Sequence, residues 1–509
     1  MILPELTPLA ALRLNQDDDV AVCVRALEAG ETVLDSVVVN ETIPAGHKVA
    51  LRDMAPGTPV RKYGQVIGAT TAAVRTGDWV HVHNLGMGEV TMRVRAHEAS
   101  PATVTAPANR TFEGYLRPDG RIGTRNYLAV VTSVNCSAMV ARRIAREVEA
   151  RLGEGFANID GVVAVTHGSG CAMESSGEAM DVLRRTLAGY AQHPNVAGVL
   201  MLGLGCETNQ LSGLTEAEGL ASGDTLSTMT IQGEGGTSAT IAAGIERMMA
   251  MAQAANSLTR TPQPLSGLVV GLQCGGSDGY SGVTANPALG HAVDLLVAQG
   301  GTAILSETPE IYGAEHLLTR RAADPSVTER LMGRIGWWER HVAATGGSMD
   351  NNPSAGNKAG GLTTILEKSL GAVAKAGSSQ LNAVYGYAEP VTAPGLVFMD
   401  TPGYDPVSAT GQIAGGANLI CFTTGRGSVF GAKPAPSLKL ATNTAMYRRM
   451  ADDMDLDCGE ILSAGVSIPE MGERILDLMI RTASGEPSRS EALGFGEDEI
   501  QPWRIGAVM

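Results

Sequence analysis

The sequence predicts an α/β protein with a small β-rich N-terminal domain, followed by a mainly parallel α/β region in two halves. Two observations support this fold class. Residues 10–98 contain short apolar runs separated by frequent turns, which is typical of β-strands. From Tyr127 onward the chain instead repeats an apolar run, a glycine-rich turn and a segment with helical periodicity. This alternation is expected where strands and helices build a layered parallel sheet.

The N-terminal domain is assigned to residues 1–98. Its strands are expected within VAVCVRAL, TVLDSVVV, HKVALRDM, PVRKYGQVIG, WVHVHNL and EVTMRVRAH. The following segment, EASPATVTAPANRT, is rich in Ala, Pro and Thr and has no apolar periodicity. This composition indicates a linker, which we assign to residues 99–112.

Helical periodicity is clearest after Cys136, where one helix face would carry Val140, Ile144, Val148 and Leu152. Further βα units are expected at residues 161–193, 196–220, 267–300, 301–322, 395–415 and 417–451. The stretch 256–266, which contains two prolines, interrupts the series. We therefore expect a Rossmann-like region divided into residues 113–260 and 261–509.

Four apolar runs each end on a cysteine in a turn: YLAVVTSVNCS, VVAVTHGSGC, VLMLGLGC and LVVGLQCGGSD, with Cys136, Cys171, Cys206 and Cys274. Because ligands bind at the carboxyl ends of parallel strands, these thiols could form a soft-metal site. The alternative is that they are small buried hydrophobes, since their spacings are unlike the short CxxC pairs of zinc and ferredoxin sites.

Length and charge restrict the function further. At 509 residues the chain can form two or three domains. Its formal net charge of −15 argues against a general nucleic-acid or anionic-membrane surface. No segment has the features of a signal peptide or a membrane span, and the seven dispersed cysteines fit reduced thiols. We therefore expect a cytoplasmic protein that binds neither nucleic acid nor membranes.

Histidines occur at two informative places. In WVHVHNL, a strand would project His81 and His83 from one face, about 6–7 Å apart, where they could bind a metal or transfer protons. The alternative is a pair of exposed histidines near a strand end. In THGSGC, His167 and Cys171 share a glycine-rich loop that could approach a bound group. An ordinary turn whose histidine caps the next helix remains the alternative.

Cationic side chains framed by small residues are candidates for binding an anion. Arg426 lies between two glycines, a setting that suits a carboxylate, and Lys433 and Lys439 follow it. Lys358 and Lys375 are also bracketed by glycine or alanine, although a solvated surface is the ordinary place for a lysine.

One carboxylate stands out in the same way. Glu307 follows the apolar run GTAILS at an expected strand end. It could act as a general base, a metal ligand or a helix cap.

Several of these motifs resemble one known family. GHKVALRDM, PVRKYGQVIG and WVHVHNL resemble the N-terminal SAF domain of the altronate and galactarate dehydratases. The catalytic region of that family is similar to RPDGRIGTRNYLAV, GLGCETNQ, CGGSDGYSGVTANP, NPSAGNKAGG, EKSLGAVAKAGSS and FTTGRGS. The resemblance spans most of the chain.

The resemblance implies an iron-dependent hydro-lyase that converts a small anionic sugar acid into a 2-keto-3-deoxy acid. Iron, either a single Fe²⁺ or a cluster and with Mn²⁺ as a possible substitute, would be held by Cys136, Cys171, Cys206, Cys274 and His167. Proton transfer would involve His81, His83, Glu307, Lys358 and Lys375. Substrate binding would involve Arg426, Lys433 and Lys439.

The sugar acid itself stays open. The H-x-H motif is similar to the altronate branch, which favours an altronate-like aldonate, whereas TPGYDPVSATGQIAGG and GSVFGAKPAPSLKLATNT depart from it. Galactarate or another sugar acid is an alternative. Another is a sulfolactate sulfo-lyase. Those enzymes carry the β domain and the catalytic region on separate subunits, so their fusion in one chain favours dehydration. The remaining alternative function is a non-catalytic sugar-acid-binding protein. For its assembly, a homo-oligomer is possible.

Overall fold

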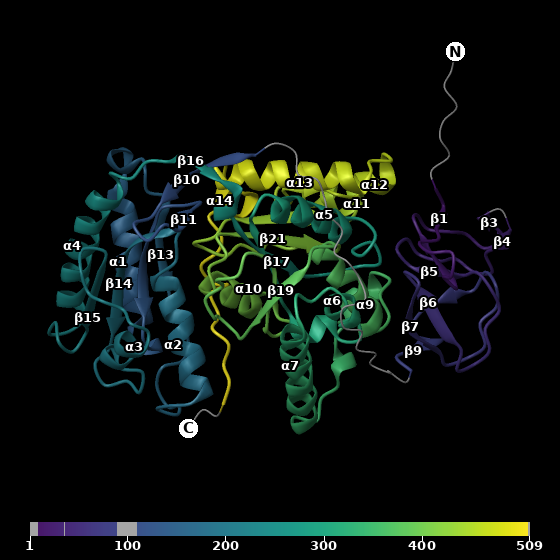
Figure 1. Ribbon diagram of the computed structural model, residues 1–509, viewed down its shortest axis with the longest axis horizontal. Helices are drawn as coiled ribbons and strands as arrows, with labels where there is room; N and C mark the ends of the chain where they lie inside the picture. Colours follow the sequence, from purple (N-terminus) through teal and green to yellow (C-terminus); the bar gives the residue numbers. More distant parts are fainter. Residues whose placement is uncertain (1–8, 35, 89–108, 507–509) are drawn as a thin grey trace, which may run out of the picture.

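The computed structural model describes residues 9–34, 36–88 and 109–506. Three parts lie side by side in Figure 1, with the N-terminal β domain at one end, a large α/β unit in the centre and a smaller α/β unit at the other end. The predicted fold class is confirmed. Residues 89–108, which include the expected strand EVTMRVRAH and most of the predicted linker, lie outside the described part of the chain.

The N-terminal domain consists of short antiparallel strands. One sheet has the order β1-β2-β5-β8, a second has the order β6-β7-β9, and β3 pairs with β4. Side chains of Ala21, Cys23, Leu27 and Val49 form part of its own small core. The strand bounds are β1 Ala11–Leu12, β2 Val20–Cys23, β3 Thr32–Val33, β4 Val37–Val38, β5 Lys48–Ala50, β6 Pro59–Lys62, β7 Gln65–Thr70, β8 Trp79–Val80 and β9 Leu85–Gly86.

The smaller α/β unit has a parallel four-stranded sheet of order β13-β12-β14-β15. Alternate residues of β12 face opposite sides: Leu128 packs with Ile144 of α1, whereas Ala129 packs with Leu187 of α2. Helix α1 has the predicted buried face. The elements are β12 Tyr127–Thr132, η1 Asn135–Ser137, α1 Ala138–Leu152, η2 Glu154–Phe156, β13 Gly161–Val165, α2 Glu178–Ala191, β14 Val196–Gly203, α3 Leu211–Ala217, β15 Leu226–Thr230 and α4 Thr237–Ala255.

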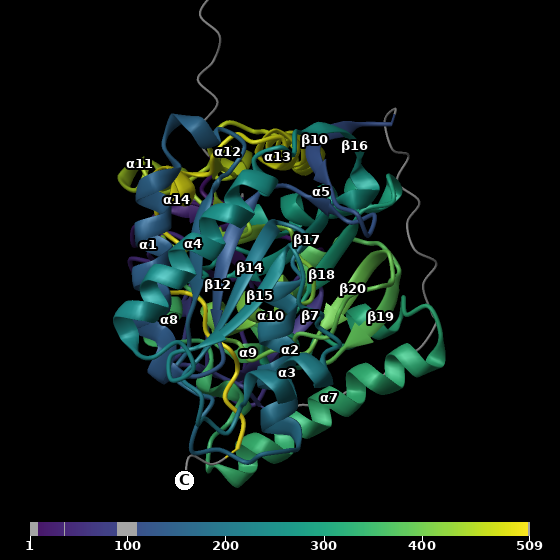
Figure 2. The same cartoon turned by 90° about the vertical axis from the view of Figure 1, so that its left-hand side faces the viewer.

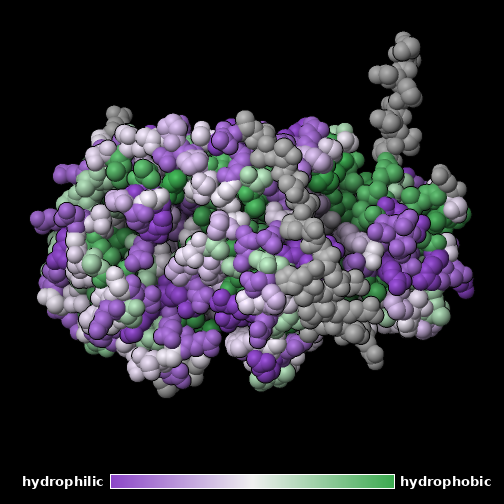
Figure 3. All heavy atoms as spheres, in the orientation of Figure 1, coloured by the Kyte–Doolittle hydropathy of each residue, from purple (hydrophilic) through white to green (hydrophobic). Residues whose placement is uncertain are grey.

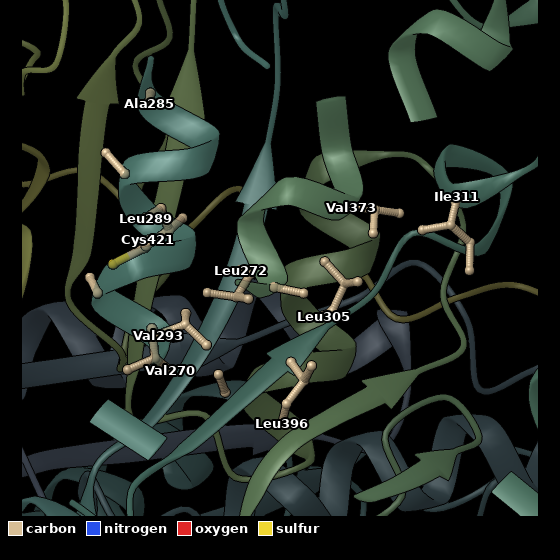
Figure 4. Packing of buried hydrophobic residues seen from close by; sticks show 14 of the residues in the cluster. Val270, Leu272, Ala285, Leu289, Val293, Leu305, Ile311, Val373, Leu396 and Cys421 are labelled. Carbon is tan, nitrogen blue, oxygen red and sulfur yellow. The ribbon is translucent and has the colours of Figure 1, made fainter. Parts of the chain in front are cut away.

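The central unit has a parallel seven-stranded sheet of order β19-β20-β18-β17-β21-β22-β23. In Figure 4, Val270 and Leu272 of β17 pack with Leu289 and Val293 of α5 on one face of this sheet. The strands are β17 Val269–Cys274, β18 Thr302–Leu305, β19 Leu381–Tyr385, β20 Gly395–Met399, β21 Leu419–Thr424, β22 Ser437–Ala441 and β23 Leu456–Asp457.

Helices cover both faces of the central sheet. They comprise η3 Leu265–Gly267, α5 Ala285–Ala298, η4 Thr308–Ile311, α6 His316–Thr319, α7 Pro325–Ala344, η5 Met349–Asn351, α8 Ala355–Ala359, α9 Ile365–Val373, η6 Ala374–Ala376, α10 Asp405–Ala414, α11 Thr444–Arg449, α12 Glu460–Ser463, α13 Ile468–Ala483 and α14 Arg489–Ala492.

Helices α2 and α10 form a shared layer between the two sheets. Side chains of both helices and of both sheets belong to one hydrophobic cluster, which includes Leu187, Ile413 and Phe422. Figure 2 views the smaller sheet from its own side, with the central unit behind it. The helices touch where Gly189 meets the carbonyl oxygen of Ala414, because no Cβ intervenes.

Two segments differ from the expected pattern. Within 256–266, β16 (Thr261–Pro264) pairs antiparallel with β10 (Thr111–Leu116), and β11 (Ile122–Gly123) completes a small sheet. Its prolines are tolerated because β16 is an edge strand. The expected unit 417–451 contains two strands, β21 and β22. The sequence pattern did not reveal β22, because the buried Lys439 interrupts its apolar run.

No helix in the described ranges is long and apolar enough to cross a membrane. Figure 3 shows polar and apolar side chains interspersed over the two α/β units.

We expect Gly189→Ala to destabilise the protein by about 1–3 kcal/mol, because its Cβ would overlap the Ala414 carbonyl and force α2 away from α10. The matched control is Gly333→Ala in α7, where a Cβ meets nothing within 4 Å. That change should be neutral or slightly stabilising, since alanine is the better helix former. Urea denaturation of both variants checks the difference, and equal midpoints would contradict the proposed helix contact.

Candidate active site

The order of strands in the central sheet reverses between β17 and β21, which makes this point the expected ligand crevice. Cys274 ends β17, and Arg426 follows β21. The two loops are tied together because the backbone N–H groups of Gly425 and Arg426 donate to the carbonyl of Gly276, at 3.1 and 2.9 Å. The carboxyl edge of the sheet therefore presents both loops at one place.

A lysine, a thiol and a carboxyl group form a buried cluster at this edge. The Lys375 ammonium lies 2.8 Å from Cys274 Sγ and 3.1 Å from Glu307 Oε2. Glu307 adopts a left-handed backbone conformation with φ 68°, held by its N–H bond to the Thr401 hydroxyl at 2.9 Å. Such strain in a non-glycine residue is concentrated at functional sites, where it aims a side chain.

Burial controls the ionisation of this cluster. It raises the pKa of the Cys274 thiol to about 12, so the group is uncharged at neutral pH. Burial and the neighbouring Glu310 raise the pKa of Glu307 to about 8, although Lys375 acts in the opposite direction. Burial disfavours the charged Lys375, but Cys274 and the two glutamates raise its pKa above the ordinary value. The cluster thus holds a carboxyl group that can gain or lose a proton near neutral pH.

Sequence patterns missed the acidic residues around this cluster. Glu310 accepts a bond from the Lys368 ammonium at 2.7 Å and lies 3.5 Å from Cys274 Sγ. Asp405 lies against Gly275, and burial with the nearby Glu310 raises the pKa of its carboxyl to about 6. The only sequence signal for them is an acidic residue just beyond a strand, which is also common in helix caps.

Cys274, Glu307 and Glu310 are the one group of metal-ligand side chains in the described ranges whose donor atoms all lie within 4.8 Å of one another. Glu307 Oε1 is buried and has no hydrogen-bond partner. However, Lys375 and Lys368 already donate to the other atoms of the group. Because two ammonium ions would repel a metal cation, the group fits proton transfer better than metal binding.

The N-terminal domain covers this edge through a buried ion triad. Lys48 and Lys62 of that domain each lie 2.9 Å from the carboxylate of Glu367 in α9, and all three side chains are fully buried. The carboxylate also accepts the backbone N–H and hydroxyl of Thr363. Burial alone would raise the pKa of Glu367, but the two lysines hold it far below its usual range.

The H-x-H motif does not form the predicted strand face. Strand β8 ends at Val80, because the Asn84 side chain accepts the His81 N–H and donates to the Trp79 carbonyl, closing a turn. His81 is buried whereas His83 is exposed, so the two side chains do not share one face. The Trp79 ring contacts both histidine rings.

A third histidine accompanies them. His47, which the sequence patterns did not select, lies 4.8 Å from His81 between ring centroids. Its Nδ1 accepts from Trp79 Nε1 at 3.1 Å and its Nε2 donates to the Ala359 carbonyl at 3.3 Å, so both nitrogens are engaged. His81 Nδ1 is buried and unpartnered. Burial, together with Lys48, lowers the pKa of His81 to about 4, which keeps the ring neutral.

The predicted substrate cations lie in different surroundings. Arg426 is exposed at the switch point and passes beside Gly360, just after the helix that carries the half-buried Lys358. Lys433 pairs with Glu497 at 3.2 Å, and the buried Lys439 donates to the Phe430 carbonyl at 2.9 Å. The structure thus places Arg426 beside Gly360, two residues after Lys358, whereas Lys433 and Lys439 have other partners.

The predicted metal ligands divide between the two sheets. Cys136, Cys171 and Cys206 are exposed at the carboxyl edge of the smaller sheet, and Cys274 is buried in the central one. His167 Nε2 bonds to the Thr132 carbonyl at 3.0 Å and its Nδ1 accepts the Ser169 N–H. With both nitrogens engaged, His167 offers no free ligand atom.

A buried lysine, thiol and carboxyl group at a switch point, covered by a second domain, define an acid–base enzyme of the open α/β class. Three family profiles match consecutive parts of the chain. They are the altronate/galactarate dehydratase SAF domain at residues 9–88, the second domain of D-galactarate dehydratase/altronate hydrolase at 114–256, and the C-terminal D-galactarate/altronate dehydratase domain at 265–508. The chain belongs to the altronate and galactarate dehydratase family.

Full-length relatives agree with this family. The chain is 34% identical over 495 residues to altronate dehydratase of Bacillus subtilis, covering 96% of this chain and 97% of that protein. It is 34% identical over 492 residues to altronate dehydratase of Escherichia coli, covering 96% and 97%. It is 36% identical over 494 residues to galactarate dehydratase (L-threo-forming) of Escherichia coli, covering 94% of each. The predicted class, a sugar-acid dehydratase and hydro-lyase, is confirmed, and the particular sugar acid is not settled.

We expect Glu367→Gln to destabilise the protein by about 3 kcal/mol, because two buried ammonium ions would lose their counter-charge. The folded-state pKa of Glu367 is depressed, so its contribution is present above the ordinary glutamate pKa of about 4.3 and is lost as the pH falls below it.

Urea denaturation between pH 7 and pH 3 measures this effect. Wild type should lose stability on acidification more steeply than Glu367→Gln. The exposed control Glu460→Gln, which removes a surface pair with Arg474, should change stability by less than about 1 kcal/mol. Parallel pH profiles of wild type and Glu367→Gln would contradict the assigned charge state.

Proposed function

We propose that this dehydratase acts on an altronate-like aldonate, from which it removes the C2 proton and the C3 hydroxyl to yield a 2-keto-3-deoxy acid. The observation that carries the proposal is the Lys375–Cys274–Glu307 cluster at the switch point, with Arg426 exposed beside it. The similar identities to altronate and galactarate enzymes make galactarate the alternative substrate.

Glu307 is the base that we propose for C2. Removing a proton beside a carboxylate creates a second negative charge, so nearby cations must stabilise the resulting enolate. The ammonium groups of Lys375 and Lys368 are buried at this place, where a low dielectric strengthens their effect. Glu307 Oε1 has no partner and is therefore available to accept the proton.

The remaining roles belong to residues nearer the domain interface. Arg426 would pair with the substrate carboxylate through two parallel bonds, as a planar guanidinium can. Lys358, at the end of α8, would donate a proton to the departing C3 hydroxyl. His81 is neutral and would accept a substrate hydroxyl rather than donate a proton to it.

The family resemblance implies iron, with Mn²⁺ as a substitute, which when bound would act as a Lewis acid on the leaving hydroxyl. The Cys274–Glu307–Glu310 group fits such an ion poorly because two lysines occupy it. Within the part of the chain that the structure describes, the three exposed thiols of the smaller sheet have no such cation among their hydrogen-bond partners, and their soft donors suit iron.

Arg426→Lys should lower kcat/KM by about tenfold or more, equivalent to about 1.4 kcal/mol, because an ammonium cannot form the two parallel bonds. A panel of hexonates and hexarates, with 2-keto-3-deoxy product as the readout, identifies the substrate for this measurement. Arg143→Lys on the surface of α1 is the control and should leave turnover unchanged. Unchanged kinetics in a stable Arg426→Lys variant would remove this residue from the site.

The pH dependence of kcat tests the proposed base. Because Glu307 must be ionised to accept a proton, wild-type kcat should rise with pH through about 8. Glu307→Gln should lower kcat by about 10²-fold or more and abolish that rise. If the variant keeps both the rate and the inflection, another residue is the base.

A further inference from the structure

Three exposed thiols come from three neighbouring strands of the smaller sheet. Cys136, Cys171 and Cys206 follow β12, β13 and β14 respectively, and these strands are adjacent in the sheet. Strand order reverses between β12 and β14, so the thiol loops surround the switch point of this sheet. This edge therefore has the position of a ligand crevice, separate from the edge that carries Cys274.

The three loops are hydrogen-bonded to one another within three residues of each thiol. The Asn135 N–H donates to the Ser169 carbonyl at 2.9 Å, and the Asn209 N–H donates to the Gly170 carbonyl at 2.9 Å. Gly170, with φ 98°, packs against the Ser133 carbonyl so closely that a side chain would not fit. The exposed thiols are thus held by a rigid backbone.

The surroundings are unlike those of ordinary surface cysteines. The other four cysteines of the chain are buried, as is usual for free thiols. Gln232 Nε2 donates to Cys206 Sγ at 3.3 Å, the kind of N–H···S bond that tunes iron–sulfur centres. Ala172, next to Cys171, has a left-handed backbone with φ 54°, which is a strain typical of functional loops.

The three sulfur atoms do not lie close enough together to bind one ion. Thiolates that bind one metal ion at about 2.3 Å must lie about 4 Å from one another. In the described ranges no three metal-ligand side chains that include these cysteines have donor atoms within 4.8 Å of one another. Glu207 cannot complete a single-ion site, because its two oxygens accept from Ser133 and Gly205, both at 2.6 Å. A group with several metal atoms does not require such close thiolates, since each thiolate binds a different atom.

We propose that Cys136, Cys171 and Cys206 hold an iron–sulfur cluster of the [4Fe–4S] type, in which the fourth iron has no protein ligand. This inference deepens the proposed function, on which it rests for the role of the iron. The open iron can take an oxygen ligand such as a substrate hydroxyl.

A cleft lies beside the Cys171 loop of the smaller sheet. It has a volume of about 610 Å³, and Cys171 lines one side of it while Tyr404 and Val407 line the other. Asp405, between those two residues in the chain, lies against Gly275 beside the buried cluster. The cleft beside Cys171 is thus bordered by the chain segment that also carries Asp405.

The test is anaerobic reconstitution of the full-length protein with ferrous iron and sulfide, followed by removal of unbound metal. We expect about four iron and four sulfide per chain, broad absorbance near 400 nm and an electron paramagnetic resonance signal after reduction. Cys136→Ser, Cys171→Ser and Cys206→Ser should each lose most of the absorbance and iron. Because these positions are exposed, circular dichroism should show an unchanged fold, and Cys→Ala variants provide a second check.

The control is Cys274→Ser, which should retain the full absorbance while losing dehydration. The inference is overturned if wild type binds no sulfide, if it binds about one iron per chain, or if the three exposed variants keep the absorbance. Dehydration by rigorously iron-free protein would overturn the inference and leave the proposed function standing. If the cluster assembles but the protein turns over no sugar acid, the proposed function is overturned and the inference about the cluster stands.

Discussion

The buried carboxylate of Glu367 links the N-terminal domain to the central sheet and to the cluster of Lys375, Cys274 and Glu307. Two lysines of the N-terminal domain surround it, and its own helix α9 packs against the central sheet. The next residue, Lys368, binds Glu310, and the turn after α9 carries Lys375 to Cys274. Domain docking and assembly of the proton-transfer cluster therefore depend on the same short helix.

Charge balance explains why so many ionisable groups can be buried at this edge. Lys48, Lys62, Lys368 and Lys375 each have a carboxylate within hydrogen-bond distance, which offsets part of the cost of removing them from water. Glu307 is the exception, because Glu310 and Asp405 lie near it and one of its oxygens has no partner. A buried carboxylate whose negative charge is only partly balanced has a raised pKa, so it gains and loses a proton near neutral pH, as a general base must.

The two sheets divide the chemistry expected of a dehydratase. The edge of the central sheet concentrates buried lysines and carboxyl groups, and the edge of the smaller sheet presents three exposed thiols. The layer formed by α2 and α10 holds the sheets at a fixed separation. A cleft beside the smaller sheet is lined by Cys171 and by Tyr404 and Val407, the segment that also carries Asp405.

Local patterns were sufficient to predict the fold class, the buried face of α1 and the strands that lead to the four selected cysteines, because these features depend on residues close together in the chain. Which strand ends meet was decided by tertiary structure, which separated Cys274 from the other thiols and placed it beside Lys375. The turn that divides His81 from His83 depends on the side chain of Asn84, which periodicity does not reveal. Lys48 and Lys62 look like ordinary charged strand residues, and only the docked N-terminal domain buries them against Glu367. The sequence by itself determined the elements and their chemistry, whereas long-range packing decided which charges lost their water and so acquired shifted pKa values.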